Sequence, residues 1–278
     1  MARRHGIQLK SPAQVQKMRA AGLVVAEALA QMRAAVAPGV STADLDAIAR
    51  DVLAGHGATS SFLGYDIGNG PFPAVICSSV NERIVHGIPR ADEILRDGDL
   101  VSLDFGAIVD GWHGDAAITV GVGALSAEAA QLAAAGEKAL WDGIAAIGLG
   151  RRLGDVSHAV QESVEASGSY GILAGYGGHG IGTEMHQDPH VLNHGPAGRG
   201  VKLQKGICLA IEPMITLGSD DSVELEDGWT IATADGSWSA HWEHSVALLA
   251  DGLWVLTAPD GGRAELEARG VALTSLAD

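Results

Sequence analysis

Apolar side chains recur every three, four or seven residues near the start of the chain, which is the spacing of one helix face. Their positions are Val15, Met18, Val25, Leu29 and Met32. Ser11-Pro12 comes just before them and is a typical helix start, because serine caps free amides and proline fits the first helical turn. The pattern predicts a helix that begins after Ser11 and ends before Pro38-Gly39.

The helical pattern is repeated three more times along the chain. A second helix follows the first and is capped by Ser41 or Thr42. A second pair of helices is predicted further on, one long and alanine-rich after Ser126, the other opening at Gly154-Asp155. Strand-like segments come after each pair. The order of helix pair and then strands, found twice, indicates two related halves.

The region from Leu100 to Val120 alternates apolar and polar residues, and it predicts two strands joined at the turn dipeptide Asp110-Gly111. A two-residue turn at that point places Gly106 opposite Asp115, so that Asp104 lies diagonal to Asp115 on one sheet face. Diagonal neighbours are about 7–8 Å apart at the backbone. Both carboxylates can then reach metal ions that lie about 3.5–4 Å from each other.

No linker-like tract of proline, serine or charged residues separates the two halves. One compact α+β domain is therefore expected rather than two independent ones. The expected organisation is an N-terminal arm at residues 1–10 and a single domain at 11–278, with related halves at about 11–123 and 124–250.

Composition narrows the class of protein. The 278 residues are 47% hydrophobic and carry a net charge of −16, which argues against a nucleic-acid-binding surface with its clustered lysines and arginines. No apolar run approaches the roughly 18 residues of a membrane span, and no signal peptide is predicted. The two cysteines, Cys77 and Cys208, make neither a disulfide scaffold nor a cysteine-based zinc site. An acidic, soluble, cytoplasmic enzyme is expected.

Two segments of the chain echo each other. Residues 97–104 and 205–212 each run from a polar residue and a glycine through a mostly apolar stretch to a carboxylate, Asp104 in the first and Glu212 in the second. Taken alone, Asp104 is typical of a turn or cap, and Glu212 is typical of a partner for a buried arginine. The shared template weakens both of these interpretations.

A second acidic residue follows each segment, Asp115 after the first and Glu243 after the second. Carboxylates within apolar strands are costly to bury unless a cation compensates them. His179 lies between the two segments in the glycine-rich run at 176–182, which taken alone fits a flexible turn or, less well, a phosphate-binding loop that lacks its lysine. Hard oxygen ligands and one imidazole fit a two-metal hydrolytic centre.

For other histidines the sequence leaves two interpretations, a surface position or a functional role. His86 and His186 lie in loops and are candidates for either role. His113 and His241 flank the candidate ligands Asp115 and Glu243, which makes them candidates for a supporting shell around a metal.

The ordered motifs resemble type I methionine aminopeptidases of metallopeptidase family M24, from about Ser11 to Leu249. The segments that carry the resemblance are Asn81–Pro89, His113–Asp115, Gly178–Gly182, Ile211–Met214 and Trp242–His244. The resemblance implies the pseudo-symmetric "pita-bread" fold, with two halves of helix pair and strands around a curved antiparallel sheet. It also implies two divalent ions, such as cobalt, manganese or iron(II). Their implied ligands are Asp104, Asp115, His179, Glu212 and Glu243, with Asp115 and Glu243 bridging.

The implied activity is removal of the initiator methionine from nascent proteins whose second residue is small, by a hydroxide that bridges the two ions. Glu212 is expected to act as general base and then acid, His186 to contact the substrate carbonyl oxygen, and His86 to lie by the scissile nitrogen. The residues expected to form the methionine pocket are Tyr65, Phe72, Cys77, Met185 and Trp229.

The chain departs from the usual motif at Phe62, at Met185 and in the extra residues at 66–71, which leaves the pocket shape open. The alternatives are a proline-specific peptidase of the same fold and a non-catalytic peptide-binding module, although all five implied ligands are present. The expected partner is the N-terminal methionine of a nascent polypeptide, with ribosome contact and a monomeric state as further expectations. The sequence does not fix the native ion.

Overall fold

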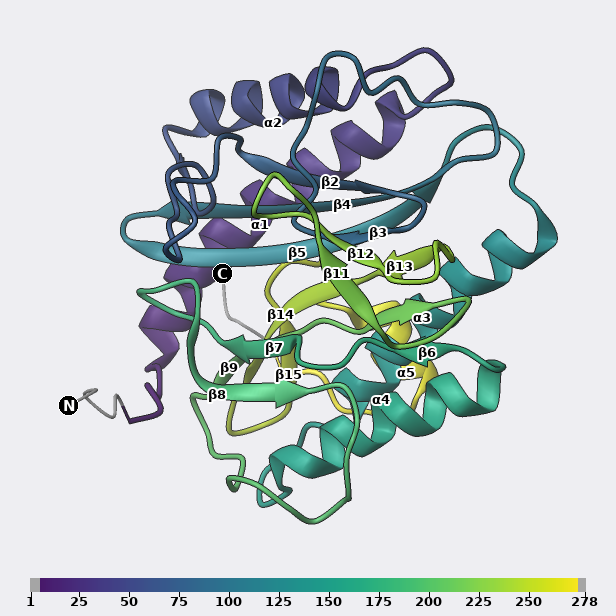
Figure 1. The fold of residues 1–278 in the computed structure, drawn as a ribbon. Coiled ribbons are helices and arrows are strands. Elements are labelled where there is room, and N and C mark those ends of the chain that lie inside the picture. Colours follow the sequence, from purple (N-terminus) through teal and green to yellow (C-terminus); the bar gives the residue numbers. More distant parts are fainter. Residues whose placement is uncertain (1–5, 275–278) are drawn as a thin grey trace.

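A computed structural model describes residues 6–274 of the chain (Figure 1). The helices are α1 Pro12–Ala35, α2 Thr42–His56, α3 Ala127–Ala145, α4 Leu153–Ser167 and α5 Arg263–Ala268. The predicted caps are confirmed at Ser11, Ser41 and Ser126, whose side chains accept hydrogen bonds from the third helical amide. The fourth helix begins at Leu153, one residue before the predicted start, because the Asp155 carboxylate holds the amide of Arg152 at 2.8 Å.

The strands form one large sheet and two small ones, all with antiparallel pairing in the described residues. The large sheet runs β1-β4-β5-β14-β9-β7-β8, with β2 on β4 and β15 on β14, and the small sheets run β13-β10-β6 and β11-β12-β3. The strands are β1 Thr59–Ser60, β2 Ile76–Val80, β3 Arg83–Val85, β4 Leu100–Val109, β5 Trp112–Gly121, β6 Gly171–Ile172, β7 Gly177–Gly180, β8 Gln187–Leu192, β9 Cys208–Ile211, β10 Met214–Thr216, β11 Ser222–Glu224, β12 Ile231–Thr233, β13 Ser239–His241, β14 Glu243–Leu248 and β15 Leu253–Val255.

The predicted hairpin is confirmed residue by residue. Asp110 and Gly111 have φ of +49° and +77°, as a two-residue turn of the primed type requires. Gly106 therefore pairs with Asp115, and Asp104 pairs with Ala117. The turn chemistry alone sets this register, which puts both acidic side chains on one face of the sheet.

The second half of the chain joins this hairpin through β14. Ala117 of β5 pairs with Glu243 of β14, so one row across the sheet runs from Cys77 on β2 through Asp104 and Ala117 to Glu243. The next strand, β9, leads directly into Glu212, and β7 beyond it carries His179. Strand pairing thus gathers side chains that lie more than a hundred residues apart in the sequence.

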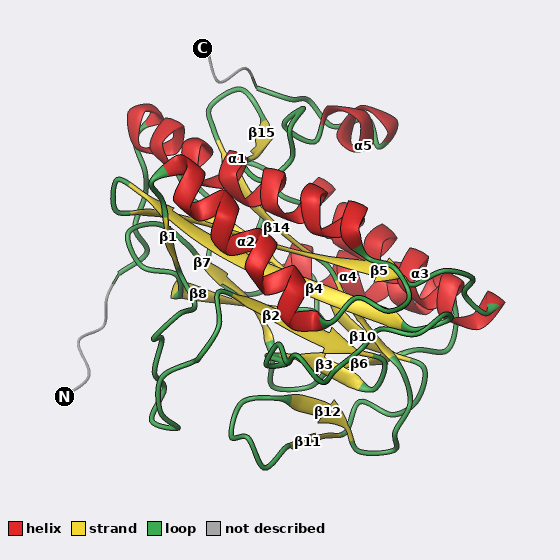
Figure 2. Cartoon of the chain, turned by 90° about the horizontal axis from the view of Figure 1, so that it is seen from above, coloured by secondary structure: helices red, strands yellow, loops and turns green. Residues whose placement is uncertain are grey.

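The helices cover one side of the sheet, and the β11–β12 hairpin projects on the other (Figure 2). Both cysteines are buried and free. Within residues 6–274, no helix combines the length and the apolar character that crossing a membrane requires.

Helix α1 approaches the sheet so closely that only glycine fits at the contact. A Cβ on Gly22 would lie 2.1 Å from the carbonyl oxygen of Leu256, and one on Gly114 would lie 2.7 Å from the amide nitrogen of Gly22. We expect Gly22→Ala to lower the free energy of unfolding by about 1–3 kcal/mol, the usual cost of overpacking. Gly55→Ala is the control, since nothing lies within 4 Å of its added Cβ. Urea unfolding curves that match for the two variants would contradict this packing.

Candidate active site

Two overlapping groups of acidic and histidine side chains lie where the strands of the two halves meet. In one group, ligand atoms of Asp115, His179 and Glu243 all lie within 4.8 Å of one another, and in the other the same holds for Glu212, His241 and Glu243. Glu243 belongs to both groups. Asp104 stands outside these groups but directly across the hairpin from Ala117, the residue that pairs with Glu243.

The donor atoms of this cluster fit divalent metal ions. Asp104 Oδ1, Asp115 Oδ1 and Glu243 Oε1 are buried and have no hydrogen-bond partner in the described structure, and the same is true of His241 Nε2. A buried acceptor without a partner typically costs about 1–3 kcal/mol, and more if it is charged. Carboxylate oxygens are the ligands that hard divalent cations prefer. The cluster is therefore built to surround cations.

Electrostatics lead to the same conclusion. Burial, and then the neighbouring carboxylates, raise the pKa values of Asp104, Glu212 and Glu243 well above their usual range. Burial likewise raises the pKa of Asp115 to about 7. At neutral pH it is therefore unfavourable for all of these carboxyl groups to be ionised at once. A bound cation offsets this cost because it favours the charged form of each group.

The tautomer and protonation state of His179 suit metal binding. Its Nδ1 donates a hydrogen bond to the carbonyl oxygen of Gly180 at 3.0 Å, which leaves Nε2 unprotonated and facing Glu212 Oε1 at 3.6 Å. Burial, with a smaller contribution from His186, lowers the pKa of His179 to about 3. The imidazole is therefore neutral at physiological pH, as metal binding requires.

These pKa shifts predict a pH-dependent response to metal removal. Because these pKa values are raised, the carboxyls of the metal-free native protein bind protons at a higher pH than those of the unfolded chain. The carboxyls therefore destabilise the metal-free protein less as the pH falls through about 7. Bound metal competes with the same protons. We expect the increase in Tm caused by Mn²⁺ to be large at pH 8 and small at pH 5.5. Thermal unfolding with Mn²⁺ and with EDTA measures it, and an equal increase at both pH values would contradict the assignment.

The cluster forms one end of a pocket of about 250 Å³. Its other end is apolar and is lined by all five side chains expected to hold methionine, from Tyr65 to Trp229. Phe62 packs into the same apolar group. The Trp229 and Phe72 rings meet edge to face with centroids 5.2 Å apart. The structure thus brings the predicted metal ligands and the predicted pocket residues into one cavity.

The two loop histidines also line this cavity. His186 Nδ1 lies 2.8 Å from the Tyr65 hydroxyl, and its ring centroid is 4.4 Å from that of His179. His86 has a φ of +59°, which is uncommon for a residue with a side chain; such conformations occur in turns and cluster at functional sites. Burial, and then His186, lower the pKa of His86 to about 4.

The sequence predicted only a supporting role for His241, whereas the structure places it within the second ligand group. The side chain is 2% exposed, and its Nε2 lies 3.7 Å from Glu212 Oε2 within the second group. The signal was present, because His241 is two residues before Glu243 and alternate residues of an extended chain share a face. His190, which also lines the cavity, carried no such signal.

Comparison with known proteins identifies the family. The model of metallopeptidase family M24 matches residues 16–249, which is most of the chain. The chain belongs to metallopeptidase family M24. Among its relatives, methionine aminopeptidase 1 of Mycobacterium tuberculosis is 53% identical over 259 residues, covering 91% of this chain and 96% of the relative. Methionine aminopeptidase of Clostridium acetobutylicum is 45% identical over 251 residues, covering 90% and 98%.

Solved structures of the M24 type have the same fold. Methionine aminopeptidase from Thermotoga maritima superposes with a TM-score of 0.87 at 40% identity, covering 91% of this chain and 99% of that one. Prolidase from Pyrococcus furiosus gives 0.71 at 18% identity, covering 90% and 65%, which shows the fold alone. The expected "pita-bread" α+β class and the resemblance to methionine aminopeptidases are confirmed, and the proline-specific alternative is not favoured.

Proposed function

We propose that this M24 enzyme removes the N-terminal methionine from polypeptides, and that it prefers those whose second residue is small. One observation carries the proposal: a buried cluster of unpartnered carboxylate oxygens opens directly into an apolar pocket. The relatives named methionine aminopeptidase, which match almost end to end, support it. We further propose that the substrates are nascent chains at the ribosome, that the enzyme is a cytoplasmic monomer, and that residues 11–278 form its single catalytic domain.

We assign the metal site to the five residues that the sequence motifs indicated, which would hold divalent ions: Asp104, Asp115, His179, Glu212 and Glu243. The donor set is four carboxylates and one imidazole, which suits manganese, cobalt or iron(II). When bound, such ions supply a water that is nucleophilic at neutral pH and stabilise negative charge on the reacting carbonyl. The Glu243 carboxylate would be central to such a site because it belongs to both ligand groups.

The remaining steps belong to the side chains around the cluster. Glu212 accepts a proton from the attacking water and delivers it to the leaving amine, as general base and then acid. His186 donates a hydrogen bond from Nε2 to the carbonyl oxygen, in the tautomer whose Nδ1 accepts from the Tyr65 hydroxyl at 2.8 Å. His86 contacts the nitrogen of the scissile bond. The apolar end of the cavity binds the methionine side chain.

Trp229 is expected to contribute strongly to methionine selectivity. It packs against both Phe72 and His86, so its removal widens the apolar end of the cavity while the carboxylates stay in place. We expect Trp229→Ala to lower kcat/KM for Met-Ala peptides by about 10–200-fold, the usual effect of a lost apolar contact in a specificity pocket. Bound metal measured on the same sample should match wild type. Undiminished selectivity for methionine over alanine at the first position would remove Trp229 from the pocket.

A peptidase assay tests the proposed function directly. The chelated enzyme is titrated with Mn²⁺ or Co²⁺ and given Met-Gly-Met, Met-Ala and Met-Leu peptides alongside Xaa-Pro substrates. Metal-dependent release of methionine that is fast with glycine or alanine in second position, and slow with leucine, is the expected result. Preferential cleavage of Xaa-Pro, or release without any metal dependence, would overturn it.

A further inference from the structure

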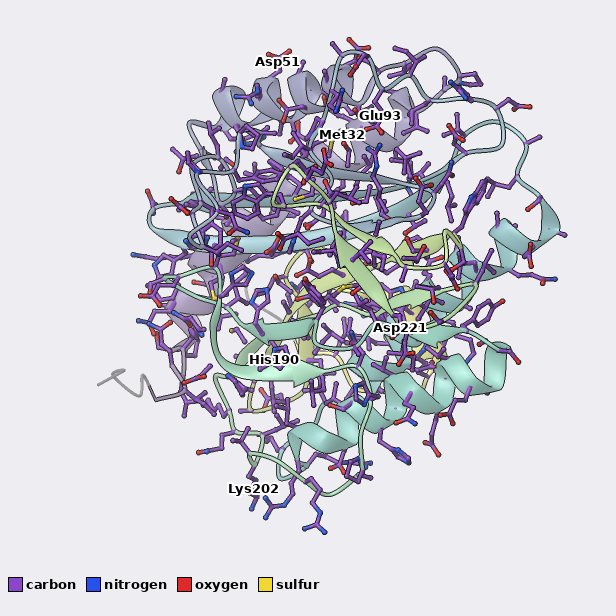
Figure 3. All side chains as sticks on the ribbon, in the orientation of Figure 1. Met32, Asp51, Glu93, His190, Lys202 and Asp221 are labelled. Carbon is purple, nitrogen blue, oxygen red and sulfur yellow. The ribbon has the colours of Figure 1, made fainter. Side chains whose placement is uncertain are left out.

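A second groove adjoins the active-site cavity and is not used by the proposed chemistry. It has a volume of about 710 Å³. The two share a boundary made of Gly177, His179, His186 and His190, so the groove opens directly onto the reacting centre. Figure 3 labels one of these residues, His190, on β8. Its outer walls come from residues 183–188, the last two of which begin β8, and from residues 6–8 of the N-terminal arm.

The walls of the groove are held together by specific contacts. Gln8 Nε2 donates to Thr183 Oγ1 at 3.2 Å, and the Lys10 ammonium donates to Gln187 Oε1 at 3.2 Å. Gly182 lies so close to the arm that an added Cβ would meet Gln8 Oε1 at 2.3 Å. Segments about 175 positions apart in the sequence therefore form one fixed channel.

The groove carries negative charge. Glu184 and Asp188 both line it and are exposed, and neither forms an ion pair within residues 6–274. No lysine or arginine is among the described lining residues; Lys10, which contacts the wall, is only 4% exposed. The other side chains that line the groove are glutamine, threonine and histidine.

The direction of the substrate follows from the shape of the cavity. If the methionine side chain fills the apolar end between Phe72 and Trp229, the peptide bond lies at the carboxylates, and the rest of the polypeptide leaves on the far side of the cluster. The groove shares with the cavity His179, an assigned metal ligand, and His186, which is placed at the carbonyl oxygen, so a chain that leaves the peptide bond can enter the groove.

We infer that this groove binds the polypeptide downstream of the scissile bond, and that Glu184 and Asp188 make the enzyme favour lysine or arginine in the third to fifth positions of its substrate. The inference rests on the proposed function and extends it from the first two residues to the next three. Exposed charge pairs contribute little each, so a preference of about two- to ten-fold in kcat/KM is expected at low salt. Salt reduces it, because the pairs are screened.

The test compares Met-Ala peptides with three lysines, three glutamines or three glutamates at positions three to five, at pH 8 with saturating metal. Wild type should cleave the lysine peptide fastest. Glu184→Gln/Asp188→Asn should equalise the three rates, and Glu184→Lys/Asp188→Lys should reverse their order. The control variant Asp51→Asn/Asp251→Asn removes two exposed carboxylates from α2 and from the turn before β15, and it should keep the wild-type order.

The short peptide Met-Gly-Met separates the two proposals. Its C-terminally amidated form should be cleaved at the same rate by wild type and by all three variants, because its third residue then carries no charge. If wild type fails to cleave it, the proposed function is wrong. If it is cleaved but the three longer peptides react alike, or the control variant abolishes the lysine preference as well, the groove is not the binding site and only this inference is lost.

Discussion

Glu212→Gln is expected to lower kcat for Met-Ala peptides by about 10²–10⁴-fold, the range that a positioned general base supplies. The change keeps the shape of the side chain but removes its ability to accept a proton. It also removes one anionic oxygen ligand, so the affinity for metal should fall as well. Glu212 Oε1 faces His179 at 3.6 Å and Oε2 faces His241 at 3.7 Å, which places it between two imidazoles at the centre of the cluster.

The two effects of Glu212→Gln are separated by measuring activity at saturating Mn²⁺. Restored metal content with activity still low is the expected outcome, and it assigns the proton transfer to this carboxylate. Glu128→Gln is the matched control, because Glu128 is exposed on α3 and takes no part in the site. Activity close to wild type at saturating metal would remove Glu212 from the chemistry.

His186→Ala is expected to lower kcat by about 10²–10³-fold, as loss of an oxyanion donor usually does. Metal content and unfolding temperature should stay near wild type, since the side chain hydrogen-bonds Tyr65 and lies outside both ligand groups. The loss should fall on kcat more than on KM, because this hydrogen bond strengthens as charge develops on the carbonyl oxygen.

Tyr65→Phe gives a graded companion to that experiment. It removes the hydroxyl that sets the tautomer of His186 but leaves the imidazole in place, so a smaller loss than that of His186→Ala is expected. A His186→Ala enzyme within a few-fold of wild type would show that another group stabilises the carbonyl oxygen.

The elements that the sequence predicted well are those with local signals. The Ser11-Pro12 start of α1 depends on residues within one helical turn, and the register of the β4–β5 hairpin depends on the Asp110-Gly111 turn. Because that register is set locally, the relation between Asp104 and Asp115 could be derived from the turn and the alternation of the strands. The order of motifs along the chain then gave the family, which the comparisons confirm.

Long-range contacts could not be predicted in this way. The pairing of β5 with β14 and of β14 with β9 brings Glu243 and Glu212 to the hairpin, and periodicity does not specify which strands pair. The contact of His241 with Glu212 depends on the same pairing. The acidic groove was equally hidden, since its walls come from the arm near Gln8 and the loop near Glu184.

Anomalous diffraction from crystals grown with Mn²⁺ tests most directly the claim that buried carboxylates from both halves exist to hold cations. Two manganese peaks are expected in the cavity, each about 2.0–2.6 Å from carboxylate oxygens. The Asp115 and Glu243 side chains should contact both peaks, and His179 Nε2 should contact one. No peak among these side chains, or manganese bound only elsewhere, would contradict the account.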